Sequence, residues 1–165
     1  MDFDKDIITL ATSLLEAARQ RSLQIVTAES CTGGLVSSAL TSISGSSDVF
    51  DRGFVTYTNE AKHQMLDVST NSLEKYGAVS EAVAKEMAYG ALVNSMADIA
   101  VSITGIAGPT GGSEEKPVGT VYFGLCFMGD APQCFKKSFE NADRNEVRRL
   151  SIIYALSIML EMIAS

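Results

Sequence analysis

The sequence predicts a three-layer α/β/α domain, in which helices cover both faces of a central sheet. Short apolar runs alternate along the chain with segments whose apolar residues recur at helical spacing. The run at 99–103 is continuously apolar, which is typical of a strand covered on both faces. With 165 residues, the chain is long enough for one substantial core, so we expect a single domain over residues 1–165.

The first half of the chain is predicted to alternate between helices and strands. Apolar residues recur at helical spacing from residue 5 to residue 20, and β-branched and aromatic residues mark two short strands. In order, we expect a helix at 5–20, a strand at 23–28, a helix at 35–43, a strand ending at Tyr57, a helix at 60–66 with Asn59 as its N-cap, and a helix at 71–76 that ends at Gly77.

The second half is predicted to contain two further helices, a buried strand and a hairpin. Ser80 opens a helix that runs to about residue 94, and the strand at 99–103 follows. Strands at 118–127 and about 133–139 then form a hairpin around Gly129-Asp130. A last helix begins after Asp143, which has the spacing of a capping box with Glu146.

The last helix is apolar around much of its circumference, with Ile152, Tyr154, Met159 and Ile163 on different sides. Such a helix is either sandwiched in the core or part of a contact between subunits. We expect a homo-oligomer and favour a dimer.

Composition and charge exclude several classes of function. With 46% hydrophobic and 20% charged residues, the chain is a folded protein rather than a disordered one. A net charge of −7 argues against nucleic-acid and anionic-membrane partners, which need a basic face, but leaves room for a small phosphorylated ligand. The acidic start lacks the positive flank of a signal peptide, and the most apolar segment, 150–165, is too short to span a bilayer.

The three cysteines, Cys31, Cys126 and Cys134, are odd in number and have no CxxC spacing. They suggest reduced thiols in a cytoplasmic protein. No His/Cys/Asp cluster has the spacing of a metal site, so we expect neither a metal nor another cofactor.

Two glycine-rich turns are candidates for ligand binding. Residues 29–34, ESCTGG, link a strand to a helix, a geometry that aims backbone N–H groups at an anion. The turn has neither the Walker A nor the GxGxxG pattern, so a plain connection is the alternative. The loop at 104–113 follows the carboxyl end of a strand, the usual ligand edge of an α/β sheet. A flexible hairpin connection is the alternative there.

A third stretch, 45–62, combines Ser47, Tyr57 and Lys62. These side chains could converge at one strand end as a nucleophile and a base without histidine. Ordinary polar residues around a loop, a strand and a helix are the alternative. His63 is the only histidine, and its place beside Lys62 on a short helix favours a solvated residue over a member of a Ser-His-Asp triad.

Five motifs together resemble one family, the CinA C-terminal domain family, which includes stand-alone nicotinamide-nucleotide amidohydrolases. They are TAESCTGGL at 27–35, GSSDVF at 45–50 with the pattern GSSxxF, GFVTYTNEAK at 53–62, GAVSE at 77–81 and SITGIAGPTGGSEEKPVGTV at 102–121. The resemblance covers nearly the whole chain. It implies a mixed, mostly parallel sheet and the hydrolysis of nicotinamide mononucleotide to nicotinic acid mononucleotide and ammonia.

The resemblance also implies which residues form the site. It matches the catalytic serine, tyrosine and lysine to Ser47, Tyr57 and Lys62. Arg144, a cation in a first helical turn where the helix dipole disfavours it, is our candidate for the substrate phosphate, although a solvated arginine is the alternative. The substrate-binding walls are Ser30, Cys31, Thr32, Gly33, Gly34, Thr104, Gly105, Ala107 and Gly108.

The expected mechanism is acyl transfer, in which the Ser47 hydroxyl attacks the carboxamide and Lys62 removes its proton directly or through Tyr57. A free lysine has a pKa near ~10.4, so burial would have to lower it towards roughly 7–8. Two alternatives stay open. One is an amidase with Cys31 as the nucleophile. The other is a nucleotide-binding or regulatory module without chemistry.

Overall fold

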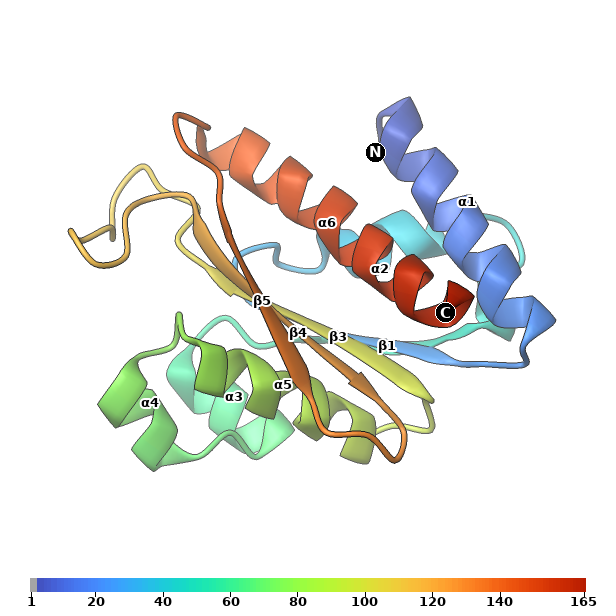
Figure 1. Ribbon diagram of the computed structural model, residues 1–165, viewed down its shortest axis with the longest axis horizontal. Coiled ribbons are helices and arrows are strands. Elements are labelled where there is room, and N and C mark those ends of the chain that lie inside the picture. Colours follow the sequence, from blue (N-terminus) through green and yellow to red (C-terminus); the bar gives the residue numbers. More distant parts are fainter. Residues whose placement is uncertain (1–2) are drawn as a thin grey trace.

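A central sheet separates two layers of helices in the computed structural model, which describes residues 3–165 (Figure 1). The sheet has five strands in the order β2-β1-β3-β4-β5. The strands are β1 (Ile25–Glu29), β2 (Phe50–Val55), β3 (Ile99–Gly105), β4 (Thr120–Phe127) and β5 (Gln133–Ser138). The three-layer α/β/α prediction is confirmed, and the first two residues of the predicted domain lie outside the described residues.

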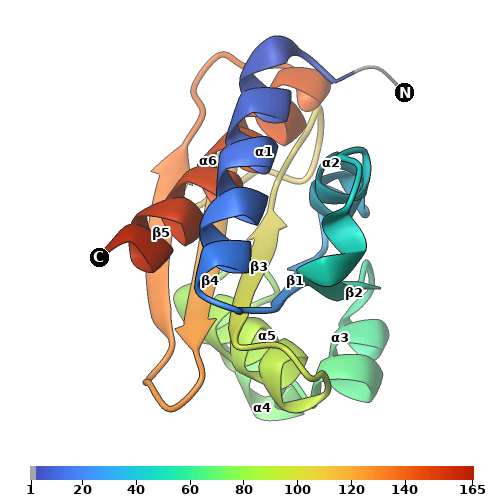
Figure 2. The ribbon, with the colours of Figure 1, turned by 90° about the vertical axis from the view of Figure 1, so that its right-hand side faces the viewer.

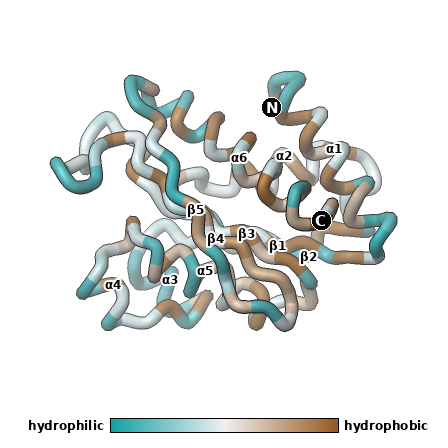
Figure 3. The backbone as a smooth tube through the Cα atoms, viewed as in Figure 1, coloured by the Kyte–Doolittle hydropathy of each residue, from teal (hydrophilic) through white to brown (hydrophobic). Residues whose placement is uncertain are grey.

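The helices divide into two groups, one on each face of the sheet (Figures 1 and 2). One face is covered by α1 (Lys5–Gln20), α2 (Leu35–Thr41) and α6 (Arg144–Ala164), and the other by α3 (Asn59–Leu66), α4 (Thr70–Tyr76) and α5 (Glu81–Val93). Hydrophobic residues concentrate along the central strands that both groups cover (Figure 3). Within residues 3–165, no helix combines the length and the apolar character needed to cross a membrane.

Strand β1 lies inside the sheet, with the next strand of the chain, β2, on one side and the following strand, β3, on the other. It pairs in parallel with β2 on one side and with β3 on the other. β4 is antiparallel to both of its neighbours, so the sheet is mixed and four of its strands share one direction. The carboxyl ends of β1, β2 and β3 therefore meet at one edge of the sheet, which we call the carboxyl edge. Ligands of open α/β sheets bind in the crevice outside such an edge.

Helix α6 is sandwiched between α1 and the sheet (Figure 2). The side chains of Ile152, Met159 and Ile163 are buried, and the rings of Tyr154 and Phe123 meet edge to face with centroids 4.7 Å apart. The apolar circumference of this helix is thus explained by the core, where each fully buried aliphatic side chain contributes about 1.5–3 kcal/mol. The homo-oligomer stays a prediction.

Most predicted elements are confirmed, several boundaries differ by one or two residues, and two of the differences bear on the site. Strand β2 begins at Phe50 and ends at Val55, before Tyr57. Thr58, not Asn59, caps α3, because its backbone is extended and its hydroxyl accepts a hydrogen bond from the N–H of Ala61 at 3.0 Å. Threonine and asparagine are both good N-caps, so the choice depends on where the preceding chain is anchored. It is anchored by the hydrogen bond from the N–H of Thr56 to the carbonyl of Glu29.

Candidate active site

The carboxyl edge brings together residues from three strands. Ser30 follows β1 directly, and its N–H donates to the carbonyl of Ile103 in β3 at 2.9 Å. Thr56 and Tyr57 follow β2, and Lys62 lies in the first turn and a half of α3. Because these strands are parallel, segments that are far apart in the sequence meet at this edge.

Lys62 is the largest fully buried side chain at this edge, with 1% of its surface exposed. Its Nζ donates to Ser30 Oγ at 3.0 Å, to the carbonyl of Thr56 at 2.9 Å and to the carbonyl of Tyr57 at 3.4 Å. Among residues 3–165, no carboxylate lies within ion-pairing distance of Nζ. Burial therefore lowers the pKa of Lys62 from 10.5 to about 8, since the ammonium form loses its water. An uncharged amine this close to a serine hydroxyl is able to accept the hydroxyl proton as a general base.

Ser47 lies at the other end of β2. It belongs to a short 3₁₀ turn, Ser46–Asp48, that precedes the strand, and its side chain is exposed. Lys62 follows the strand, and a six-residue strand is about 20 Å long. The predicted convergence of Ser47 with Lys62 is therefore wrong, because β2 separates the two residues. The hydroxyl that contacts Lys62 belongs to Ser30, which had been predicted as part of the substrate wall.

Tyr57 contacts Lys62 through its backbone carbonyl and not through its phenol. The phenolic oxygen accepts a hydrogen bond from Arg144 Nη2 at 3.2 Å. Arg144 Nη1 also donates to the carbonyl of Gly108 at 2.8 Å. The structure thus joins Tyr57, Arg144 and the loop after β3, but it does not place the phenol as a proton relay between a serine and Lys62.

The loop after β1 is held by Glu29, a residue to which the sequence analysis assigned no role. Its carboxylate is fully buried and accepts hydrogen bonds from the N–H groups of Gly34, Val36 and Ser37 at 2.8–3.0 Å, and from the Ser37 hydroxyl at 2.8 Å. Charge-assisted bonds of this kind are roughly twice as strong as neutral ones. They fix the turn that carries Ser30. In the sequence, the feature that could have indicated this role is the position of Glu29, an acidic residue at the end of an apolar strand.

Arg148 of α6 also supports this loop, by donating from Nη2 to the carbonyl of Thr32 at 3.2 Å. Gly33 and Gly34 have φ of +60° and +94°, which favours glycine at this tight turn. Within residues 3–165, three buried side-chain atoms lack a hydrogen-bond partner: Thr32 Oγ1, Thr56 Oγ1 and Arg148 Nε. Such groups are rare in folded proteins, and here all three belong to residues of the carboxyl edge or to its support.

Cys31 is poorly suited to act as a nucleophile. Its side chain is 6% exposed, and burial raises the pKa of the thiol to about 12. The thiolate is the reactive form, and a buried apolar environment disfavours it at neutral pH. The geometry therefore argues against the Cys31 alternative.

The residues after β3 that are predicted to contact the substrate, Thr104 to Gly108, begin next to Ser30, whose N–H donates to the carbonyl of Ile103. Thr104 is buried and its hydroxyl donates to the carbonyl of Ala78 at 2.8 Å, so this side chain braces the chain before α5. Gly105 ends β3, where an added Cβ would lie 2.7 Å from the Val121 side chain. Ala107 lines a cavity of about 500 Å³ together with Arg144. A cavity of this size is within the range of small-molecule sites.

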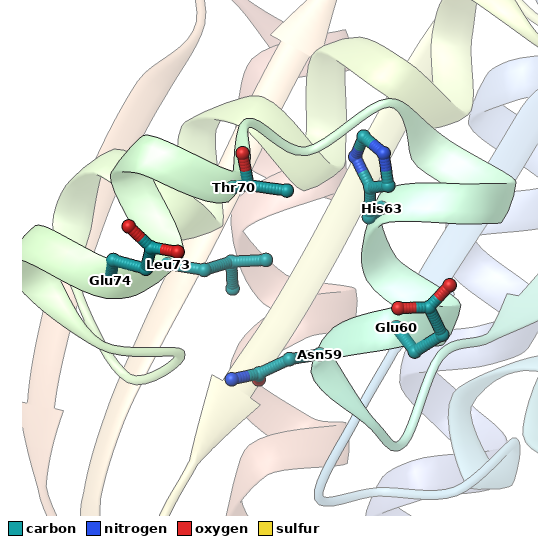
Figure 4. Close-up of a pocket in the computed structure, with 6 residues that line it drawn as sticks. All are labelled: Asn59, Glu60, His63, Thr70, Leu73 and Glu74. Atoms are coloured by element: carbon teal, nitrogen blue, oxygen red, sulfur yellow. The ribbon is translucent and has the colours of Figure 1, made fainter.

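A second cavity, of about 280 Å³, lies between α3 and α4 (Figure 4). Its lining includes two carboxylates, Glu60 and Glu74, which disfavour a phosphorylated ligand. His63 is exposed, as predicted, and its Nδ1 is 2.9 Å from the carbonyl of Val68. No group of three His, Cys, Asp or Glu side chains in the described part of the chain is arranged to hold a metal ion.

Comparison with known proteins identifies the family. A family model, the CinA C-terminal domain, matches residues 7–163. The nicotinamide-nucleotide amidohydrolase PncC of Enterobacter agglomerans is 48% identical over 157 residues, which cover 95% of each chain. The protein of the same name from Escherichia coli K12 is 49% identical over 156 residues, 94% of each chain.

A solved structure has both a similar fold and a similar sequence. The competence/damage inducible protein CihA from Agrobacterium tumefaciens matches with a TM-score of 0.96 at 45% identity, and covers 100% of this chain and 99% of that one. The match extends over every layer of the fold and over the carboxyl edge. This chain therefore belongs to the CinA C-terminal domain family.

Proposed function

We propose that the protein hydrolyses the carboxamide of nicotinamide mononucleotide and releases nicotinic acid mononucleotide and ammonia. One observation carries the chemistry: the buried Lys62 Nζ, 3.0 Å from Ser30 Oγ, has a pKa lowered to about 8. The substrate is supported by near-full-length relatives that bear the name nicotinamide-nucleotide amidohydrolase. In this role the enzyme would recycle pyridine nucleotides.

In the proposed mechanism, Ser30 is the nucleophile in place of Ser47. Uncharged Lys62 takes the Ser30 proton while Oγ bonds to the carboxamide carbon and the C=O electrons move onto oxygen. As the carbonyl reforms, the C–N bond breaks and the Lys62 ammonium gives its proton to the departing nitrogen, which leaves as ammonia. Water then attacks the Ser30 ester, with Lys62 again taking the proton. The ester C–O bond breaks, Lys62 returns the proton to Ser30 Oγ, and nicotinic acid mononucleotide leaves.

The negative oxygen of this intermediate needs donors close to Ser30. The backbone N–H groups of Cys31 and Thr32 follow Ser30 directly and have no oxygen acceptor among residues 3–165. The next N–H groups are already bound, since Gly33 donates to the carbonyl of Ser30 and Gly34 donates to Glu29. We assign the Cys31 and Thr32 groups to the oxyanion, where one such donor typically contributes about 10²–10³ in rate.

Arg144 is assigned to the substrate phosphate. Its guanidinium has five N–H donors, and the structure engages two nitrogens with Gly108 and Tyr57. Donors remain for a phosphate oxygen, and Arg144 lines the cavity of about 500 Å³, whose lining also includes one carboxylate, that of Asp143. The cytoplasmic location and the homo-oligomer stay predictions.

Incubation of the purified protein with nicotinamide mononucleotide tests the function. We expect equal amounts of ammonia and nicotinic acid mononucleotide, measured by a coupled ammonia assay and by chromatography. The free riboside, which lacks the phosphate, should react much more slowly because Arg144 has no anion to bind. Tight binding of the nucleotide without ammonia release would instead support a binding module.

The pH dependence tests the role of Lys62. Because the pKa of Lys62 is lowered to about 8, the uncharged base becomes the main form only above that pH. We expect kcat/KM to rise about tenfold per pH unit below pH 8 and to level off above it. Initial rates between pH 6.5 and 9.5 measure this. A rate that falls as the pH rises from 7 to 9 would mean that the ammonium form is required.

A further inference from the structure

Tyr57 is an exposed aromatic residue whose position spans the candidate site. At one end, its carbonyl is 3.4 Å from Lys62 Nζ, which in turn is 3.0 Å from Ser30 Oγ. At the other end, its hydroxyl is 3.2 Å from Arg144 Nη2. The residue therefore extends from the reacting pair to the group assigned to the phosphate, and 60% of its surface is open to solvent.

The proposed substrate has a feature for which the residues described so far provide no partner, namely the positive charge of its pyridinium ring. The carboxamide is attached directly to this ring. When its carbon lies at Ser30 and the phosphate lies at Arg144, the ring lies between two groups that Tyr57 also joins, through its carbonyl to Lys62 and its hydroxyl to Arg144. A cation at this point needs a compensating group, because Arg144 and Arg148 are both basic side chains of the same edge.

Glu29, the acidic residue that precedes Ser30, is not free to supply that compensation. Its carboxylate is buried and already accepts four hydrogen bonds from the loop and helix that follow. Glu60, on the α3 side of the edge, lines the cavity of about 280 Å³ between α3 and α4 (Figure 4). The π face of Tyr57 is the remaining candidate partner for the cation, because aromatic faces attract cations within about 6 Å.

We infer that the ring of Tyr57 binds the pyridinium cation of the substrate by a cation–π contact, and so selects charged over uncharged nicotinamide rings. This inference rests on the proposed function. It assigns Tyr57 a role in specificity, carried by its ring, in place of the proton relay expected from the sequence. The hydroxyl serves to hold the ring against Arg144.

The test compares nicotinamide mononucleotide with its reduced form, which has the same phosphate, ribose and carboxamide but an uncharged dihydropyridine ring. Binding of both is measured by calorimetry with the Ser30→Ala protein, so that no substrate is consumed. We expect the charged form to bind about 5- to 30-fold more tightly, the range of a partly desolvated cation–π contact. Adding Tyr57→Phe should keep this preference, because the aromatic face remains.

Adding Tyr57→Leu should reduce the preference to about twofold or less, by weakening the charged form alone. Unchanged binding of the reduced form then shows that the site is still folded. The inference is overturned if Tyr57→Leu weakens both forms equally, if the preference survives it, or if the Ser30→Ala protein binds neither form. Ammonia release by the wild-type protein is measured separately. Absence of ammonia would show that the proposed function is wrong, whereas ammonia release without a Tyr57-dependent binding preference would show that only the ring contact is wrong.

Discussion

Ammonia release by the Ser30→Ala protein is expected to be about 10³- to 10⁶-fold slower than in the wild type, as for other serine hydrolases that lose the nucleophile. The reason is that no other hydroxyl is shown in contact with Lys62 Nζ among residues 3–165. Single-turnover and steady-state ammonia assays measure the loss. Binding of nicotinamide mononucleotide should change little, because the Ser30 hydroxyl is only one small group at the edge.

Ser47→Ala is the matched control for this prediction. Ser47 is exposed and lies beyond the far end of β2, so its loss should change kcat/KM by less than about threefold, as is usual for surface substitutions. Cys31→Ala should also keep measurable activity, since burial holds the pKa of its thiol near 12. An inactive Ser47→Ala protein together with an active Ser30→Ala protein would restore the assignment predicted from the sequence.

Lys62→Met is expected to abolish ammonia release and to remove a pH dependence of stability. In the unfolded chain the lysine holds its proton up to about pH 10.4, whereas in the folded protein its pKa is about 8. The unfolded state therefore binds more protons between these values, and the free energy of unfolding rises with pH there. The destabilisation, about 3 kcal/mol, is fully present below pH 8 and is relieved as the pH rises through 8 towards 10.5.

Urea unfolding of both proteins at pH 7 and pH 9.5 measures this effect. The wild type should gain about 2 kcal/mol relative to Lys62→Met between the two pH values. Groups that do not interact with Lys62 cancel in the comparison. Cys31 does interact with Lys62, but burial raises the pKa of its thiol to about 12, so the folded protein keeps this thiol protonated at both pH values. The hydrogen bonds lost with Lys62 shift the variant's stability at both pH values and so do not alter the difference. Equal pH dependence in the two proteins would show that Lys62 is not buried as an uncharged base.

The layers of the fold follow from local patterns in the sequence. Residues 5–20 repeat their apolar positions at helical spacing, and α1 occupies that range. Gly77 and Asp143 mark a helix end and a helix start through backbone and capping preferences that depend on neighbouring residues only. The motifs that resemble the CinA C-terminal domain family likewise identify the family that the comparisons show.

The sequence also predicts residues whose surroundings in the structure fit the proposed site. Lys62 was selected as the base, and its burial provides the lowered pKa that a base requires. Arg144 and Gly108 were both placed in the site, although their contact, which spans 36 positions, was not predicted. The role of Glu29 was not predicted. Its carboxylate accepts four hydrogen bonds from a loop and a helix, and these donors come together only in the folded chain.

The sequence by itself determined the architecture and the family, because periodicity, capping and motif matches are read from residues near one another in the chain. Which serine stands beside Lys62 was decided only by the tertiary structure. Ser47 is 15 positions from Lys62 and Ser30 is 32 positions away, yet Ser30 is the one in contact. The physical reason is the parallel pairing of β1 with β2, which brings Ser30 and Lys62 to the same edge and leaves Ser47 at the opposite one.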